Sequence, residues 1–308
     1  MNQPLDLLVA GEINPDLILS GDVEPVFGQV EKLIERADLA IGSSSAIFAC
    51  GAARLGLKVA FIGVSGEDVF GRFMLAAMQA RGVDTSAVIV DPTQQTGLSI
   101  ILNRGVDRAI LTHLGTIASL RAEQIPDHLL RQARHLHVAS YFLQTALQPD
   151  LPELFDRAHT FGLTTSLDTN WDPSGEWRGF EHLLPKVDIF LPNEAEACGV
   201  ARTPVLDEAL RILASKAGIV ALKRGAHGAV AQRGSQTFKV ESIPVKVVDT
   251  VGAGDSFDAG FLYGYLNGWE LTKSLRLAAV CGALSTQSAG GTAAQPTLAE
   301  AMTYVHPE

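Results

Sequence analysis

Short, almost uninterrupted apolar runs alternate with helical patterns along most of the chain. Six runs have the length of a strand buried on both faces, and they lie at 5–10, 58–63, 135–139, 164–168, 187–191 and 219–223. Helical patterns follow them at 46–56, 151–161, 194–199, 206–217, 255–267 and 271–289. This alternation predicts an α/β fold with a mainly parallel sheet and helices on both faces.

A second group of strand-like segments breaks this alternation. These segments lie at about 12–20, 38–41 and 95–113, and the last of them contains a turn at 104–107. We expect them to form a small separate sheet that serves as a lid. Because the sequence shows no repeat and no long linker, we predict a single domain over 1–308.

Composition and charge exclude several classes of function. The 308 residues carry 24 Lys and Arg against 34 Asp and Glu, a formal charge of −10, and no basic run that would favour a nucleic-acid partner. No apolar run reaches the ~18 residues of a membrane helix and no basic leader precedes the first strand, so we expect no membrane partner and a cytoplasmic location. Cys50, Cys198 and Cys281 lack CxxC spacing, so we expect small buried hydrophobic side chains, not disulfides or a zinc site.

The segment at 248–260 joins a β-branched approach to a glycine-rich turn and then to a helix. Glycines let backbone N–H groups approach a ligand, and the first turn of a helix leaves such groups unsatisfied at the positive end of its dipole. The turn at Gly252, Ala253 and Gly254 is therefore predicted to bind an anion. Asp255 adds a carboxylate that can accept the proton of a hydroxyl group while the amides hold the transferred charge.

Polar side chains directly after the first strand are candidates for binding hydroxyl groups. In an open α/β sheet ligands bind beyond the carboxyl ends of the strands, which favours Asn14 and Asp16. A plain Asx-Pro turn is the alternative. His135 and His137 alternate on a strand, but no further ligand converges on them in the sequence, so we interpret both as structural.

Four motifs, in order, resemble those of one family. DTVGAGDSFDAG at 249–260 is similar to the second signature of the ribokinase-like (PfkB) carbohydrate kinases, and 42–71 resembles their first signature. PNEAE at 192–196 is similar to the family's Asn-x-x-Glu motif, and KRGAHG at 223–228 to its nucleotide-binding turn. The resemblance covers nearly the whole chain and implies a three-layer α/β/α sandwich with a small β lid.

The resemblance also implies a reaction, the transfer of the γ-phosphoryl group of ATP to a hydroxyl of a sugar or nucleoside. Asp255 would be the base and the amides of 252–254 the anion hole. Substrate contacts are implied for Asn14, Asp16, Gly42, Ser43 and Ile47, and nucleotide contacts for Asn193, Lys223, Gly225 and Gly228. Asp258, one turn after Asp255, is interpreted as structural.

Two metal sites follow from the same resemblance. Asn193 and Glu196 fall on one face at the start of a helix and would hold Mg²⁺ through water, although such a pair is often plain helix surface. Backbone oxygens near Asp249, Val251 and the loop at 285–292 would bind a monovalent cation such as K⁺. Relatives often dimerise through the lid, so we also expect a homodimer.

The sequence departs from the family pattern at the sugar end. Ser43 replaces the second glycine of the first signature, and Ile47 replaces an asparagine that would contact substrate hydroxyls. Asp172 occupies the place of an arginine, and a carboxylate there would disfavour an anionic sugar acid, which favours a small neutral sugar. Trp171 and Trp177 could stack on a substrate, with core packing as the more common role.

Three other functions remain open. The first alternative is a nucleoside kinase of the same fold, and a more remote one is a non-catalytic sugar-binding protein, suggested by Ile47. A dinucleotide-dependent oxidoreductase would fit the G-x-G at 252–254 only superficially. Its fingerprint normally follows the first strand and has a third glycine.

Overall fold

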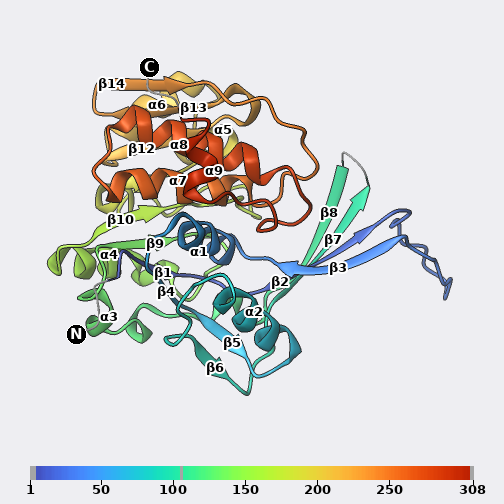
Figure 1. Cartoon of the computed structure of the whole chain (residues 1–308). Helices are drawn as coiled ribbons and strands as arrows, with labels where there is room; N and C mark the ends of the chain where they lie inside the picture. The colour runs from blue at the N-terminus through green and yellow to red at the C-terminus, as the bar shows by residue number, and fades with distance from the viewer. Residues whose placement is uncertain (1–4, 105–106, 306–308) are drawn as a thin grey trace.

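The computed structural model describes residues 5–104 and 107–305. Its centre is an eight-stranded sheet in the order β14-β13-β12-β11-β10-β9-β1-β4 (Figure 1). The strands are β1 (Leu7–Ala10), β4 (Val59–Ile62), β9 (His135–Val138), β10 (Thr164–Leu167), β11 (Ile189–Phe190), β12 (Ile219–Lys223), β13 (Ala229–Arg233) and β14 (Gln236–Val240). Neighbours from β4 to β12 pair in parallel, and the β12–β13 and β13–β14 pairs are antiparallel.

Helices cover both faces of this sheet. Leu7 and Val9 of β1 share a core with α1 (Ser44–Leu55), α2 (Val69–Gln79), α7 (Ala253–Leu266), α8 (Leu271–Ser285) and α9 (Leu298–Met302). Leu8 and Ala10 pack with α3 (Asp127–Leu130), α4 (Leu151–Thr160), α5 (Glu194–Ala201) and α6 (Leu206–Ala214). Since successive strand residues point to opposite faces, an uninterrupted apolar strand serves both cores. The predicted three-layer α/β/α sandwich around a mainly parallel sheet is confirmed.

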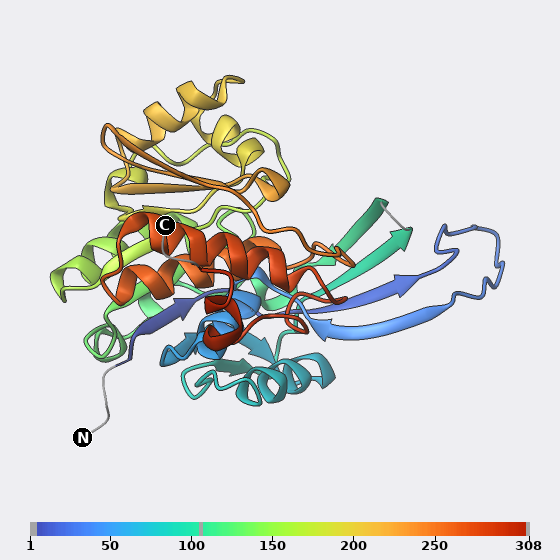
Figure 2. The same cartoon turned by 45° about the horizontal axis from the view of Figure 1, so that its top comes forward.

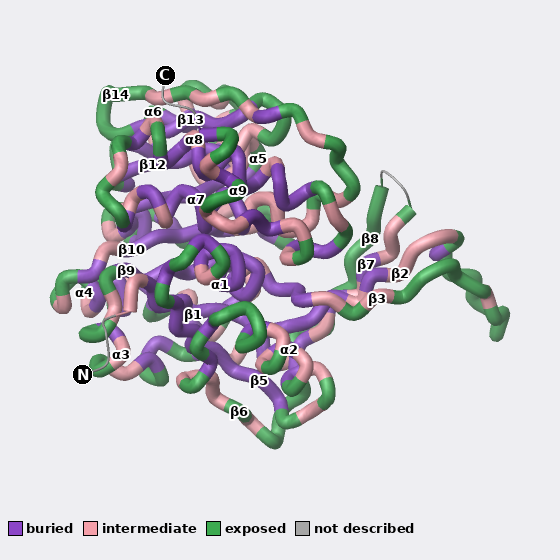
Figure 3. Tube along the Cα trace, in the orientation of Figure 1, coloured by how far each residue is buried: buried purple, intermediate pink, exposed green. Residues whose placement is uncertain are grey.

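A separate four-stranded sheet projects from the body of the molecule (Figure 2). Its order is β3 (Arg36–Ile41), β2 (Pro15–Ser20), β7 (Leu98–Arg104) and β8 (Asp107–His113). These strands lie within or next to the segments predicted for the lid, and the centre of the turn at 104–107 falls on 105–106, outside the described residues. β8 is exposed along its whole length, in contrast to the buried central strands (Figure 3).

The element boundaries differ from the predictions in a few places. A short parallel pair, β5 (Val64–Gly66) with β6 (Ile89–Asp91), forms a two-stranded sheet outside the six central runs and the three lid segments. α8 ends at Ser285, not at residue 289, because Thr286 N–H bonds the Ala283 carbonyl and the chain then turns. Among the described helices, none has both the length and the apolar character needed to cross a bilayer.

Candidate active site

A cleft of about 770 Å³ lies between the body and the four-stranded sheet. It opens where the carboxyl ends of β1, β9, β10 and β12 meet the N-termini of α1 and α7, which is where this topology places ligands. Most predicted site residues line the cleft, namely Asn14, Asp16, Ser43, Ile47, Asn193, Glu196, Lys223, Gly225, Val251, Gly252, Gly254 and Asp255. Gly42, Gly228, Asp249 and Ala253 do not line it, although each is adjacent in sequence or structure to residues that do.

The glycine turn before α7 has the geometry of an anion-binding site. Gly252 is the N-cap residue with φ of 72°, a left-handed conformation that favours glycine. The N–H groups of Gly252, Gly254 and Asp255 have no acceptor among the described residues, whereas Ala253 N–H points to the Thr250 carbonyl at 3.3 Å. The free amides at this helix end therefore include that of Asp255, and Ala253 is the weakest candidate of the predicted three.

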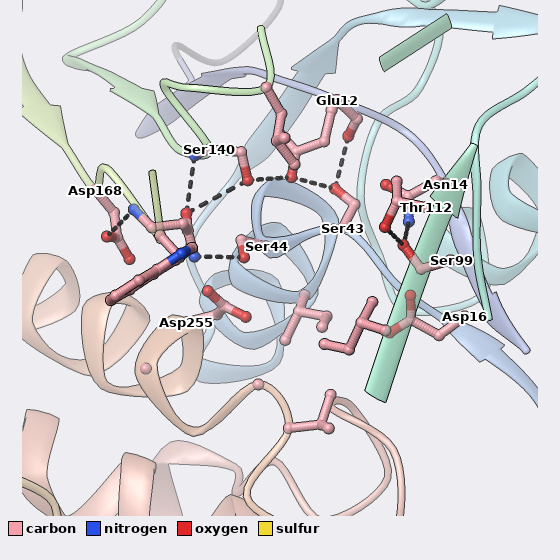
Figure 4. Close-up of a pocket in the computed structure, with 18 of the residues that line it drawn as sticks. Glu12, Asn14, Asp16, Ser43, Ser44, Ser99, Thr112, Ser140, Asp168 and Asp255 are labelled. Carbon is pink, nitrogen blue, oxygen red and sulfur yellow. Dashed lines mark hydrogen bonds between the residues drawn. The ribbon is translucent and has the colours of Figure 1, made fainter. Parts of the chain in front are cut away.

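Asp255 lies at the third position of α7 and its carboxylate faces the cleft beside Ser44 (Figure 4). The residue is only 7% exposed. Burial and the neighbouring Asp168 carboxylate raise the pKa of Asp255 well above the usual aspartate value, and Lys223 and Ser44 act in the opposite direction. A buried carboxylate with a raised pKa at the mouth of an anion hole can act as a general base.

Lys223 at the end of β12 is a largely buried cation, with only 11% of its side chain exposed, and not a surface charge. Its Nζ lies 2.7 Å from Oδ2 of Asp168 and 3.1 Å from Oδ2 of Asp258. Burial lowers the pKa of Lys223, but the two carboxylates more than offset this and raise it. Asp258, which we interpreted as structural, is thus tied to a charged group in the cleft floor.

Asn193 and Glu196 form a capping box at the start of α5. Asn193 Oδ1 accepts from Glu196 N–H at 2.9 Å, and the Glu196 carboxylate accepts from the backbone N–H of Asn193 at 2.8 Å and from its side-chain amide at 2.6 Å. Glu196 is 6% exposed, and burial with the nearby Asp168 raises its pKa to about 7. Oxygen ligands of this kind suit Mg²⁺, and because the hydrogen bonds already position them, contact through water fits best.

Glu12, which we did not predict, organises the middle of the cleft. Its buried carboxylate accepts hydrogen bonds from Ser43 Oγ at 3.0 Å and from Ser140 Oγ at 2.9 Å (Figure 4). It also accepts from Ser45 N–H at 3.2 Å. Glu12 therefore links the end of β1 to α1 and to the loop after β9. Its position directly after Gly11, at the end of a buried strand, is the same signal that identified Asn14 and Asp16.

The far end of the cleft contains the predicted hydroxyl binders. Asn14 Nδ2 lies 3.4 Å from Ser99 Oγ, which in turn lies 3.1 Å from Thr112 Oγ1 on β8 (Figure 4). Asp16 is 7% exposed, and its pKa is raised to about 7, mainly by burial, with Arg108 acting in the opposite direction. A side chain on Gly42 would collide with the Asp16 carboxylate, so this glycine makes room for Asp16.

The two departures in the first signature have separate structural roles. Ser43 has φ of 66°, the left-handed region that explains why a glycine is usual at this position, and its Oγ caps α1 by accepting from Ala46 N–H. Ile47 is 3% exposed and lies against Gly252 and Gly291. Its aliphatic side chain therefore supports the anion-binding turn as well as forming part of the cleft wall.

Asp172 does not lie where the expected repulsion of a sugar acid would need it. The Asp172 carboxylate accepts from Ser174 N–H at 2.8 Å and from Trp177 N–H at 2.7 Å, so it holds its own loop together and does not line the cleft. Its repulsion of an anionic substrate is thus not supported. Trp171 is 62% exposed and lines the cleft mouth, so it is not a core residue.

The two strand histidines are structural, as interpreted. His135 bonds Thr164 and Ser166, and His137 bonds the same Ser166 hydroxyl at 2.7 Å. Burial lowers the pKa of both to about 3, so both are neutral. Cys50 and Cys281 are buried as expected, while Cys198 is only half-buried, and all three are free thiols.

The remaining predicted residues, Gly225, Gly228 and Asp249, lie in turns at or next to the cleft. Gly225 has φ of 54° with open space around it, while a side chain on Gly228 would meet the Val240 carbonyl of β14. Asp249 accepts from Val251 N–H and from Gly290 N–H, each at 3.0 Å, and so ties the segment before α7 to the loop after α8. Gly228 and Asp249 therefore shape the turns whose neighbours reach the cleft.

Comparisons with known proteins show which sequences and structures this chain is similar to. A model described as pfkB family carbohydrate kinase matches residues 7–298. A 5-dehydro-2-deoxygluconokinase of Geobacillus thermodenitrificans is 29% identical over 96% of this chain and 91% of its own length. An uncharacterised sugar kinase of Archaeoglobus fulgidus is 32% identical over 74% of this chain and 90% of its own.

Solved structures share the fold. The structure of a candidate ribokinase II of Escherichia coli in complex with ATP and Mg²⁺ has a TM-score of 0.88 at 24% identity, over 98% of this chain and 99% of its own. At that identity the likeness concerns the fold alone. The family match over nearly the whole chain carries the assignment, and the chain belongs to the pfkB family of carbohydrate kinases.

Proposed function

We propose that this kinase transfers the γ-phosphoryl group of ATP to a hydroxyl of a small neutral sugar. The observation that carries the proposal is one cleft with Asp255 and three amides that have no acceptor among the described residues at one end, and the polar side chains of Asn14 and Asp16 at the other. The sugar oxygen attacks the γ-phosphorus while the bond to the bridging oxygen breaks and its electron pair leaves with ADP. Asp255 takes the hydroxyl proton, and the amides stabilise the phosphoryl oxygens.

The nucleotide would lie across β12 and the start of α5. Lys223 and Gly225 line this part of the cleft with Asn193 and Glu196. Mg²⁺, held through water by Asn193 and Glu196, would neutralise charge on the phosphates. K⁺ near Asp249 and Val251 is a further proposal, which equal activity in sodium, potassium and large-cation buffers would contradict.

A neutral sugar remains our proposal for a reason other than Asp172. The carboxylates of Glu12 and Asp16 both line the substrate end, and two buried acids disfavour an anionic substrate. Arg108 also lines the cleft, however, and one relative is named for a gluconate-type substrate. Sugar acids therefore belong in any substrate panel.

The experiment that tests the function is a substrate panel with ATP and Mg²⁺, read as ADP release. Ribose, fructose and sugar alcohols should give turnover well above that of the matching aldonic acids. Preferred turnover of gluconate-type acids would contradict the neutral class, and no turnover with any sugar or nucleoside would favour the non-catalytic sugar-binding alternative.

A nucleoside substrate is the second candidate, because the exposed Trp171 ring at the cleft mouth could stack on a base. Adenosine, inosine and cytidine belong in the same panel. Turnover of a nucleoside well above ribose and fructose would decide for this alternative.

The fall of kcat/KM at low pH should follow the protonation of Asp255, the proposed base. Because burial and Asp168 raise the pKa of Asp255, its basic form is lost at a higher pH than that of an ordinary aspartate. We expect kcat/KM to fall with decreasing pH at an inflection clearly above the usual aspartate value of 3.8. The Asp16→Asn variant removes another aspartate that lines the cleft, whose pKa is about 7, and should keep this acid limb. A profile that stays flat down to ordinary aspartate values would contradict the assignment.

We further propose that the four-stranded sheet closes over the sugar and pairs two subunits of a cytoplasmic homodimer. The loop between β2 and β3 exposes Phe27 and Leu33 by 95% and 84%, and Ile110 and Leu111 on β8 are also exposed. Apolar side chains at the end of a projecting sheet are typical of an association surface. A monomeric mass in light scattering would contradict the dimer.

A further inference from the structure

The floor of the cleft contains more charge than the base and the anion hole account for. Asp168, Asp255 and Asp258 bring carboxylate oxygens within 4.8 Å of one another, and all three residues are buried. Lys223 bonds two of them, Asp168 and Asp258. Burying four ionisable side chains costs free energy of folding unless the charges are well paired. Such clusters are frequent at functional sites, which suggests a role in the reaction.

The ammonium of Lys223 points toward the anion-binding turn. A Cβ built on Gly254 would lie 3.5 Å from Lys223 Nζ, and atoms of Lys223 are the nearest that it would meet outside the backbone of its own helix. Gly254 N–H is one of the amides without an acceptor. An anion bound to this amide would therefore lie next to the ammonium as well.

Asp258 is the incompletely paired member of the cluster. It is 1% exposed, and while its Oδ2 bonds Lys223, its Oδ1 has no hydrogen-bond partner among the described residues. Asp168 is better satisfied, since its carboxylate bonds Lys223 and also accepts from Asn170 N–H at 3.1 Å. Asp258 does not line the cleft, so it acts on a ligand only through Lys223.

We propose that Asp168 and Asp258 form a carboxylate clamp that holds the Lys223 ammonium below Gly254 as a fixed positive charge for the transferred phosphoryl group. Lys223 is then a catalytic residue that contacts the phosphoryl oxygens, and Asp258 is a positioning residue. The inference rests on the proposed phosphoryl transfer, because the clamp would stabilise the reaction only if the negatively charged phosphoryl group is transferred next to Gly254. A preorganised charge in a water-poor site stabilises such a transition state without reorganisation.

The two single variants and their double variant test the clamp. Lys223→Met keeps most of the unbranched side chain but removes the ammonium, and should lower kcat by about 100-fold or more, the scale of one lost anion-hole donor. Asp258→Asn should lower kcat by about tenfold, since Asp168 still holds the lysine. The KM for the sugar should change little in both, because the sugar lies at the other end of the cleft.

The double variant separates positioning from mere folding. Lys223→Met leaves Asp168 and Asp258 without their cation and should lower the melting temperature, and adding Asp258→Asn should restore part of that loss. The kcat of the double variant should stay as low as that of Lys223→Met, even though its melting temperature rises. If kcat recovers together with the melting temperature, the cluster is only structural and the proposal is overturned.

Chemical rescue provides a readout that a structural role would not move. Turnover by Lys223→Ala should rise with added ethylammonium, which can occupy the vacated site, and should not respond to tetramethylammonium. Lys186 and Asp156 form an ion pair outside the cleft, so Lys186→Met is the matched control and should keep wild-type kcat. The clamp would be overturned if added ethylammonium did not raise turnover by Lys223→Ala and if Lys223→Met kept the wild-type kcat.

The outcome for the clamp is distinguishable from that for the proposed function. If the wild type releases no ADP with any substrate, the proposed function fails before the variants are compared. If the wild type is active and Lys223→Met retains its kcat, the function stands and only the clamp fails.

Discussion

Replacement of Asp255 by asparagine should lower kcat by about 10³-fold, within the 10²–10⁴-fold range of general acid–base catalysis. Asparagine keeps the shape of the side chain but cannot accept the hydroxyl proton, so the KM values for sugar and ATP should change little. The variant should be at least as thermostable as the wild type, because burial disfavours the charged form of Asp255. Steady-state kinetics from ADP release and a thermal melt measure both effects.

The control for this variant is an aspartate in the same helical setting away from the cleft. Asp207 lies in the first turn of α6, and Asp207→Asn should leave kcat unchanged. Undiminished turnover by Asp255→Asn would remove Asp255 as the base. Loss of turnover together with a large fall in melting temperature would point to a structural role instead.

The fold was predictable because its strands are buried on both faces. The runs at 58–63 and 219–223 contain the observed β4 and β12, since a strand between two helical layers has almost no polar position to obscure it. Asp255 and Gly252 were predictable for a different reason. Their roles depend on neighbours in sequence, and a glycine turn at a helix start has the same geometry wherever it occurs.

The charged network of the cleft was not predictable, because its pairs are distant in sequence. Lys223 meets Asp168 across 55 positions and Asp258 across 35, and spacing alone does not identify such contacts. Asp172 shows the opposite limitation. Its place in the loop was clear, but its orientation depends on the amides of Ser174 and Trp177, which hold the carboxylate within its own loop and not in the cleft lining.

Replacement of Gly252 by alanine should damage both the fold and the activity. The left-handed φ of 72° strains any L-residue, and the new Cβ would lie 2.6 Å from Gly291 Cα and 2.9 Å from Ile47 Cγ2. The combined strain and overpacking should cost about 2–4 kcal/mol of unfolding free energy. Because the turn must shift to relieve the contacts, the free amides move away from the phosphoryl group, and kcat should fall by about 10²-fold or more.

Two glycine variants divide this effect into its causes. Gly162 has φ of 83° with open space around it, so Gly162→Ala should show the backbone strain alone, about 1 kcal/mol, with normal kcat. Gly254→Ala would make only ordinary contact with Lys223, so its melting temperature should stay near that of the wild type, while its methyl group enters the phosphoryl site and lowers kcat. If Gly254→Ala kept full activity, the anion would not bind at this turn, and the loss in Gly252→Ala would then reflect stability alone.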